Sequence, residues 1–235
     1  MSQRPLLLLL TLLGLLQSSP LKLQAWRLAP EGLQTIPLPS PSTNILPSTK
    51  TDFQGDGHLE MLTLNEGQAA ILSNDHILWE SPAHWQVTQA TLSDLNNDGQ
   101  PEAALLLWRP FQPWPVDRWL PHGGRINGFH NQEGMSCHLI LIAWRNGKFK
   151  ELWAGSALAE PIKSFAATDL NGDGKQELVT LEGNYTDTPF APANALKVWE
   201  WNGFGFTLID HISGRYRQFQ IVLTQENAYI ILISH

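Results

Sequence analysis

A nine-residue pattern of oxygen-bearing side chains occurs three times in the chain and limits the possible folds more than any other feature. It reads Asp-x-(Asn or Gln)-x-Asp-Gly-x-x-Glu and occupies residues 52–60 (loop 1), 94–102 (loop 2) and 169–177 (loop 3). Apolar runs typical of strands follow each copy. The copies start 42 and 75 residues apart, so the second interval carries an insertion. A repeat of roughly 40–50 residues is typical of architectures built from short repeated sheets. The sequence therefore predicts an all-β chain.

The order of the oxygens in each loop suits a divalent cation. Calcium takes about six to eight oxygen ligands in flexible geometry, and glycine at position 6 permits the sharp turn around it. Side chains at positions 1, 3, 5 and 9 and the backbone carbonyl of position 7 are the expected ligands. We therefore predict up to three Ca²⁺ ions, bound by Asp52, Gln54, Asp56, His58 and Glu60; by Asp94, Asn96, Asp98, Gln100 and Glu102; and by Asp169, Asn171, Asp173, Lys175 and Glu177.

A plain hairpin turn is the alternative interpretation of each Asp-Gly sequence. A turn, however, requires neither the first Asp nor the final Glu, and the whole pattern occurs three times. Loop 1 is the weakest match, because Gln54 replaces a shorter Asn or Asp. An EF-hand is not expected, since strand-like runs stand where its helices would be.

Acidic loops of this kind between strands resemble the FG-GAP repeat of integrin α-chain propellers and the related bacterial VCBS-type repeats. In that family the loop joins the first two strands of a propeller blade and binds Ca²⁺, so the resemblance implies a calcium-binding β-propeller. The loops supply 27 matching residues, and the strand pattern extends over most of 26–235. The Phe-Gly and Gly-Ala-Pro sequences that name the family do not stand beside any of the three loops, which places the chain in the broader bacterial group.

The strand pattern predicts four blades of four antiparallel strands. Residues 43–80, 85–154 and 162–211 each supply four strands, and 216–224 and 228–234 supply two more. Strands near 25–27 and 33–38 would complete the last blade, so that strands from both chain ends close the ring and no sheet edge stays free. We expect a monomer. An open three-bladed fragment or a half-ring that dimerises is the alternative.

A long insertion at 109–137 is the expected binding face, on the side of the propeller opposite the acidic loops. Loops of this length in compact domains are usually functional. A second insertion, 183–194, is expected on the same face. We predict that the two insertions bind a glycan, peptide or surface partner through Phe111, Trp114, Arg118, Trp119, His122, Tyr185 and Phe190. The alternative is that the insertion only plugs the central channel.

The first 25 residues have the pattern of an export signal. An apolar run at 6–16 follows Arg4, and it is about half as long as a membrane span requires. Cleavage after Ala25 would leave one domain, 26–235, without a stable membrane span and located outside the cell, in the periplasm or at the cell surface. An uncleaved anchor is the alternative.

The charge and the cysteine and histidine content exclude several other functions. The formal net charge of −7 argues against nucleic acid as a partner. The single cysteine, Cys137, allows no internal disulfide, and we expect it to be buried. His122, His130 and His138 match no zinc spacing and are expected in loops or at the surface. We predict a binding module rather than an enzyme. The alternative is a polysaccharide-active hydrolase or lyase using carboxylates of Asp117, Glu133, Glu182 and Asp187.

Overall fold

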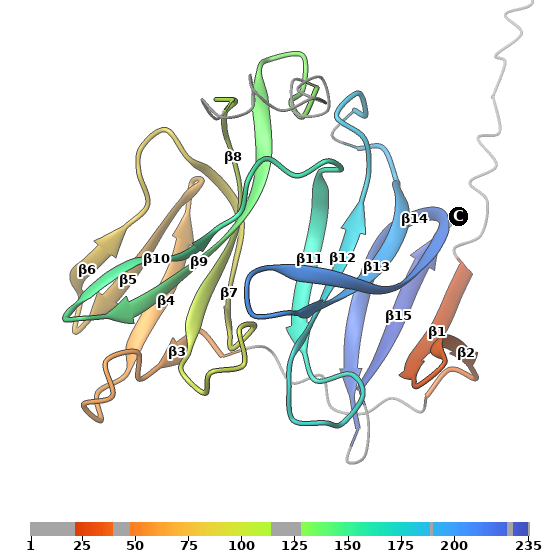
Figure 1. Ribbon diagram of the computed structural model, residues 1–235, viewed down its shortest axis with the longest axis horizontal. Helices are drawn as coiled ribbons and strands as arrows, with labels where there is room; N and C mark the ends of the chain where they lie inside the picture. Colours follow the sequence, from red (N-terminus) through yellow and green to blue (C-terminus); the bar gives the residue numbers. More distant parts are fainter. Residues whose placement is uncertain (1–21, 40–47, 114–127, 189, 225–227, 235) are drawn as a thin grey trace, which may run out of the picture.

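The fold is all-β in the residues that the computed structural model describes, which are 22–39, 48–113, 128–188, 190–224 and 228–234. Fifteen strands in these residues form three antiparallel sheets (Figure 1). The predicted all-β class is therefore confirmed. In the same residues no helix has the length and apolar character needed to cross a membrane.

Sheets 1 and 2 have four strands each and match the predicted strand groups closely. Sheet 1 has the order β3 (Lys50–Thr51), β4 (Glu60–Asn65), β5 (Gln68–Ser73) and β6 (His76–Glu80). Sheet 2 has the order β10 (Lys148–Ala154), β9 (Met135–Arg145), β8 (Glu102–Pro110) and β7 (Gln86–Ser93). Loop 1 joins β3 to β4 and loop 2 joins β7 to β8, so each acidic loop connects the first two strands of its sheet. Half of the predicted first strand of sheet 1 (43–52), residues 43–47, lies outside the described residues.

Sheet 3 has seven strands and joins two groups that the sequence predicts as separate. Its order is β11 (Ile162–Thr168), β12 (Glu177–Glu182), β13 (Ala193–Trp201), β14 (Phe206–Leu223), β15 (Ala228–Ser234), β1 (Lys22–Ala29) and β2 (Gly32–Ile36). Loop 3 joins β11 to β12. The early part of β14 pairs with β13 and its later part with β15, which divides the sheet into a first half, β11 to β14, and a second half, β14 to β2.

The prediction of two separate strands at 204–211 and 216–224 is therefore wrong, because β14 runs through both. Gly214 lies between them, and a Cβ added to it would come within 2.5 Å of the Tyr216 ring. The missing side chain gives Tyr216 room to turn back over the strand, where it is buried. The glycine thus serves close packing within one strand and does not end it.

Strands from the two ends of the chain lie side by side, as predicted. β1 pairs antiparallel with β15 from Lys22 opposite Ser234 to Trp26 opposite Ile230 (Figure 1). Ala25 is buried in this strand, and cleavage after it would remove four of the five residues that pair with β15. A cleavage before Lys22 would leave the strand whole. The rest of the predicted signal, 1–21, lies outside the described residues.

Both faces of sheet 2 are buried, which explains the unbroken apolar runs of β8 and β9. Ala103, Leu105 and Leu107 belong to a core cluster shared with sheet 1. The alternate residues Ala104 and Leu106 belong to a cluster shared with the first half of sheet 3. Because successive side chains of a strand point to opposite faces, one apolar run fills two cores.

The two halves of sheet 3 also pack on each other. A third cluster joins Val179 and Leu181 of β12 to Ile230 and Leu232 of β15. The core clusters therefore join four groups in sequence: sheet 1, sheet 2, the first half and the second half of sheet 3. No buried cluster in the described residues joins the second half to sheet 1, so closure into a ring is not seen.

Candidate metal centre

The three acidic loops share one hydrogen-bonded turn built around their first Asp. In loop 3, Asp169 Oδ1 accepts from the backbone N–H of Gly172 at 2.7 Å and of Asp173 at 3.2 Å, and Oδ2 accepts from Gly174 at 2.8 Å. Asp52 accepts the corresponding three hydrogen bonds in loop 1. Asp94 accepts from Asp98 and Gly99 in loop 2. Positions 4 and 6 have positive φ in every copy, at Gly55 and Gly57, Asn97 and Gly99, Gly172 and Gly174.

The last Glu of each loop is buried and closes the turn from inside. Glu60, Glu102 and Glu177 are at most 1% exposed. In each case Oε2 accepts the backbone N–H of position 2, at 2.8, 3.2 and 2.8 Å. Position 2 is itself a buried apolar residue in all copies: Phe53, Leu95 and Leu170. Sequence reasoning missed this anchor, although an apolar residue stands between two polar positions in each copy.

Loop 2 differs from the other two at the second oxygen of this Glu. In loops 1 and 3 the amide at position 3 donates to Glu Oε1, from Gln54 at 2.9 Å and from Asn171 at 3.1 Å. In loop 2 the Asn96 amide instead donates to Asp98 Oδ2, at 3.1 Å. Glu102 Oε1 is consequently a buried oxygen without a hydrogen-bond partner in the described structure.

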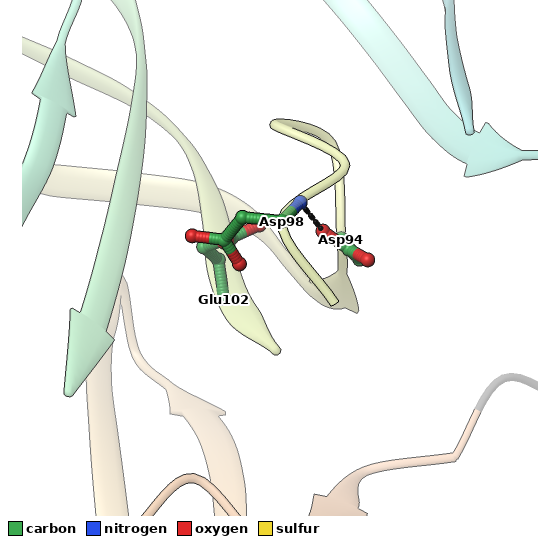
Figure 2. A group of neighbouring side chains, drawn as sticks. All are labelled: Asp94, Asp98 and Glu102. Carbon is green, nitrogen blue, oxygen red and sulfur yellow. Dashed lines mark hydrogen bonds between the residues drawn. The ribbon is translucent and has the colours of Figure 1, made fainter. Parts of the chain in front are cut away.

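The carboxylates of Asp94, Asp98 and Glu102 converge. One oxygen from each lies within 4.8 Å of the others, and Figure 2 shows the three side chains around the turn. Among the described residues this grouping occurs at loop 2 and not at loops 1 and 3. Arg145 of β9 forms an ion pair with Asp98 from the exposed side. Three acidic groups with one buried, unpartnered oxygen form a set of ligands that suits a hard cation.

Burial and neighbouring charge both act on the inner Glu. Burial, followed by the charges of Asp94 and Asp98, raises the pKa of Glu102 to about 8. Burial, followed by Asp173 and Asp169, raises the pKa of Glu177 to about 7. The outer Asp behaves differently, since the N–H of Gly57 is the main cause that lowers the pKa of Asp52. The buried Glu therefore holds a proton more readily than an exposed carboxyl does, most strongly in loop 2, and any cation bound there would have to displace that proton.

Position 7 lies outside the carboxylate group but is fixed to the turn. The N–H groups of His58, Gln100 and Lys175 donate to the Asp at position 5, at 2.8–2.9 Å. These side chains are exposed. The predicted role of the position 7 carbonyls as ligands stays a prediction.

Loops 2 and 3 are bonded to each other. The backbone N–H of Asp94 donates to the Gln176 side chain at 2.9 Å, and the backbone N–H of Gln176 donates to the Asn97 side chain at 2.8 Å. All three loops lie at one end of the sheets, opposite the end where β8 finishes and β9 begins (Figure 1), as the strand order predicts. The loop 2 site is thus fixed against sheet 3.

The predicted ligand face is only partly described, and the Tyr185 hydroxyl is already bonded within the fold. The Tyr185 hydroxyl donates to the Leu158 carbonyl at 2.7 Å and accepts the Cys137 N–H at 3.2 Å, so it braces the fold and is not free for a ligand. Phe111 packs on the His130 ring at 5.1 Å, and Phe190 is 89% exposed. Trp114, Arg118, Trp119 and His122 lie outside the described residues.

Two of the carboxylates considered for catalysis each pair with a lysine in the described structure. Asp187 forms an ion pair with Lys163 at 3.3 Å, and Glu182 forms one with Lys197 at 2.8 Å. Glu133 lies in the turn before β9, and Asp117 lies outside the described residues.

His138 and Cys137 are both buried within β9. Cys137 is fully buried as predicted, and burial raises its pKa to about 12. The expectation of a surface or loop position is wrong for His138, which is 4% exposed. Its Nδ1 bonds the Gly155 carbonyl at 3.0 Å, and its Nε2 bonds the Ser136 hydroxyl at 2.7 Å. These bonds satisfy both nitrogens, and the burial of this imidazole lowers its pKa to about 4.

No protein-family model and no curated protein matches the chain. The resemblance to FG-GAP repeats therefore depends on the three loops themselves.

Proposed function

We propose that the chain is an exported, calcium-stabilised β-propeller that acts as a binding module, with loop 2 as its strongest calcium site. The observation that carries this proposal is the buried, unpartnered Oε1 of Glu102 beside Asp94 and Asp98. A buried carboxylate oxygen without a donor is costly, and a divalent cation removes that cost while neutralising the two neighbouring charges.

The loop 2 ligands would be Asp94, Asn96, Asp98 and Glu102, with the carbonyl of Gln100. Carboxylate, amide and carbonyl oxygens in a loop that can adjust suit Ca²⁺ better than Mg²⁺, which requires a tight octahedron. Arg145 already pairs with Asp98 on the outer side, so it would share that carboxylate with the ion.

Loops 1 and 3 would bind calcium more weakly. Their backbone turns match loop 2, but Gln54 and Asn171 each donate to the inner Glu and would have to release it. Extracellular modules work with dissociation constants of about 10⁻⁴–10⁻³ M, which fits weak loops in an exported protein.

The outer faces of sheet 1 and of the second half of sheet 3, the first and last of the four packed groups, support closure into a four-bladed ring. Ala25 and Ile231 pair with each other and point away from the cluster inside sheet 3, yet both are buried. On sheet 1, Met61 and Leu72 alternate with core residues and are half-buried on the face away from sheet 2. Packing these two faces on each other would complete the ring.

Thermal unfolding with and without calcium tests the calcium proposal. After treatment with a chelator, added Ca²⁺ should raise the Tm, because an ion that binds only the folded state stabilises it. Glu102→Gln should remove most of this rise, and the matched variant Glu177→Gln should remove less. A Tm that does not respond to Ca²⁺, or a full response retained by Glu102→Gln, would refute it.

A further inference from the structure

A pocket of about 390 Å³ lies between sheet 2 and the first half of sheet 3. Strands β9 and β10 line one side, β11 to β14 line the other, and residues 155–160 between β10 and β11 complete it. It contains none of the acidic loop residues and none of the residues predicted to bind a ligand. Its size is within the range of small-molecule sites.

Three half-buried aromatic rings form its wall: Trp153, Trp199 and Phe206. Trp153 and Phe206 meet edge to face, with centroids 5.2 Å apart and planes at 81°. Leu139, Ile162 and Leu178 are buried beneath them. The wall is therefore apolar, concave and only partly covered.

Local backbone features hold Trp153 in this wall. The pairing of β10 with β9 shifts register between Glu151 and Trp153, and such a bulge changes the direction of the side chain that follows. A Cβ on Gly155 would come within 2.8 Å of the Trp153 ring and 3.0 Å of the Leu139 carbonyl. The ring lies where only glycine leaves room for it.

The polar end of the pocket is an ordered group of charges. Glu182 is 4% exposed and accepts from Thr180 at 2.7 Å, from the Trp199 indole at 3.1 Å and from Lys197 at 2.8 Å. Lys197 also pairs with Glu160, whose side chain is 52% exposed. The two carboxylates and one ammonium carry a net charge of −1, which disfavours an anion, while a cation would have to compete with Lys197.

We propose that this pocket binds an uncharged aromatic ring that carries a hydrogen-bond donor, such as a phenol or an indole. The ring would pack against Trp153 and Phe206, and its O–H or N–H would donate to the exposed carboxylate of Glu160. A sugar fits less well, because the aliphatic floor offers its hydroxyl groups few partners. This inference rests on the binding role proposed above and does not depend on the calcium loops.

Ligand-observed NMR and calorimetry with p-cresol and indole test the proposal. Both should bind saturably, whereas benzoate, benzylamine and glucose should bind at least tenfold more weakly. Trp153→Ala should abolish binding, and the matched control Trp79→Ala on sheet 1 should retain it. No saturable binding of p-cresol or indole, or equal binding of glucose or benzoate, would overturn the proposal.

A second variant, Glu160→Ala, tests the proposal even if Trp153→Ala fails to fold. Glu160→Ala should weaken p-cresol about fivefold, the usual effect of one lost hydrogen bond, and leave 4-methylanisole, which has no donor, unchanged. Equal effects on both ligands would overturn the assigned role of Glu160.

Two further experiments complete the test. The first identifies whether the aromatic ring belongs to a polypeptide or to a free small molecule, and the second distinguishes the ring site from the calcium site. A short neutral peptide with a central Tyr that binds more tightly than p-cresol identifies a polypeptide as the source, and the reverse order identifies a free small molecule. Glu102→Gln should keep p-cresol binding while it loses the calcium response, so failure of the ring site and failure of the calcium site are distinguishable.

Discussion

Glu60, Glu102 and Glu177 occupy the same position in three similar loops, but they do not have the same environment. In loops 1 and 3, position 4 is a glycine whose N–H bonds the first Asp. In loop 2, position 4 is Asn97, whose N–H bonds the Asp94 carbonyl instead and whose side chain bonds loop 3. This rearrangement accompanies the loss of the amide partner of Glu102. Loops with the same ligand pattern thus give their inner Glu different hydrogen bonds, and the residue at position 4 differs with them.

At the residue scale, His138 predicts a dependence of stability on pH. Its pKa falls from 6.5 to about 4 in the folded chain, mainly through burial. Between these two pH values the unfolded chain binds more protons than the folded chain does. The contribution of His138 to the free energy of unfolding is therefore fully present above pH 6.5 and is lost as the pH falls toward 4. The loss is about 3 kcal/mol.

Urea unfolding of wild type and His138→Gln at pH 7, 6 and 5 measures this contribution. The difference between the two proteins should shrink as pH falls, because the variant has no proton to take up at this position. His76→Gln, at an exposed site, serves as the control. A difference that stays constant across this range contradicts the assignment to His138.

At the element scale, neighbouring sheets are joined by side-chain amides as well as by apolar packing. A register shift in β7 between Val87 and Gln89 turns Gln89 toward β11. Its side chain donates to the Phe165 carbonyl at 2.6 Å and accepts the Phe165 N–H at 3.0 Å. One amide thereby satisfies both backbone groups of a residue in the next sheet, much as a neighbouring strand would.

Removal of this amide should loosen the contact between sheets 2 and 3. Gln89→Ala leaves two backbone groups of Phe165 without partners, which should lower the free energy of unfolding by about 1–3 kcal/mol. Gln86→Ala, at an exposed position of the same strand, should change it little. Equal effects of the two variants in urea unfolding would show that the Gln89 bonds contribute nothing specific.

At the scale of the whole molecule, four four-stranded groups pack one on the next. A closed ring of this chain should have a radius of gyration of about 18 Å, the value for a compact domain of its length. X-ray scattering should give that value together with the mass of a monomer. A markedly larger radius, or the mass of a dimer, would favour the open alternative.

Much of this organisation could be predicted from the sequence. Strands β5, β6 and β12 lie where the pattern places them, because acidic turns and alternating apolar residues mark their ends. The continuity of β14 could not be predicted, since Gly214 suggests a break and instead accommodates Tyr216. The pocket was also missed, because it depends on a bulge beside Trp153 and on side chains from two sheets.

Calorimetric titration of the chelator-treated protein with Ca²⁺ tests most directly whether the carboxylates of loop 2 bind a cation, as we propose. We predict saturable binding, with one site fewer in Glu102→Gln than in wild type at the same pH. Binding heats that are absent from the wild type, or a site number that Glu102→Gln leaves unchanged, would contradict the account.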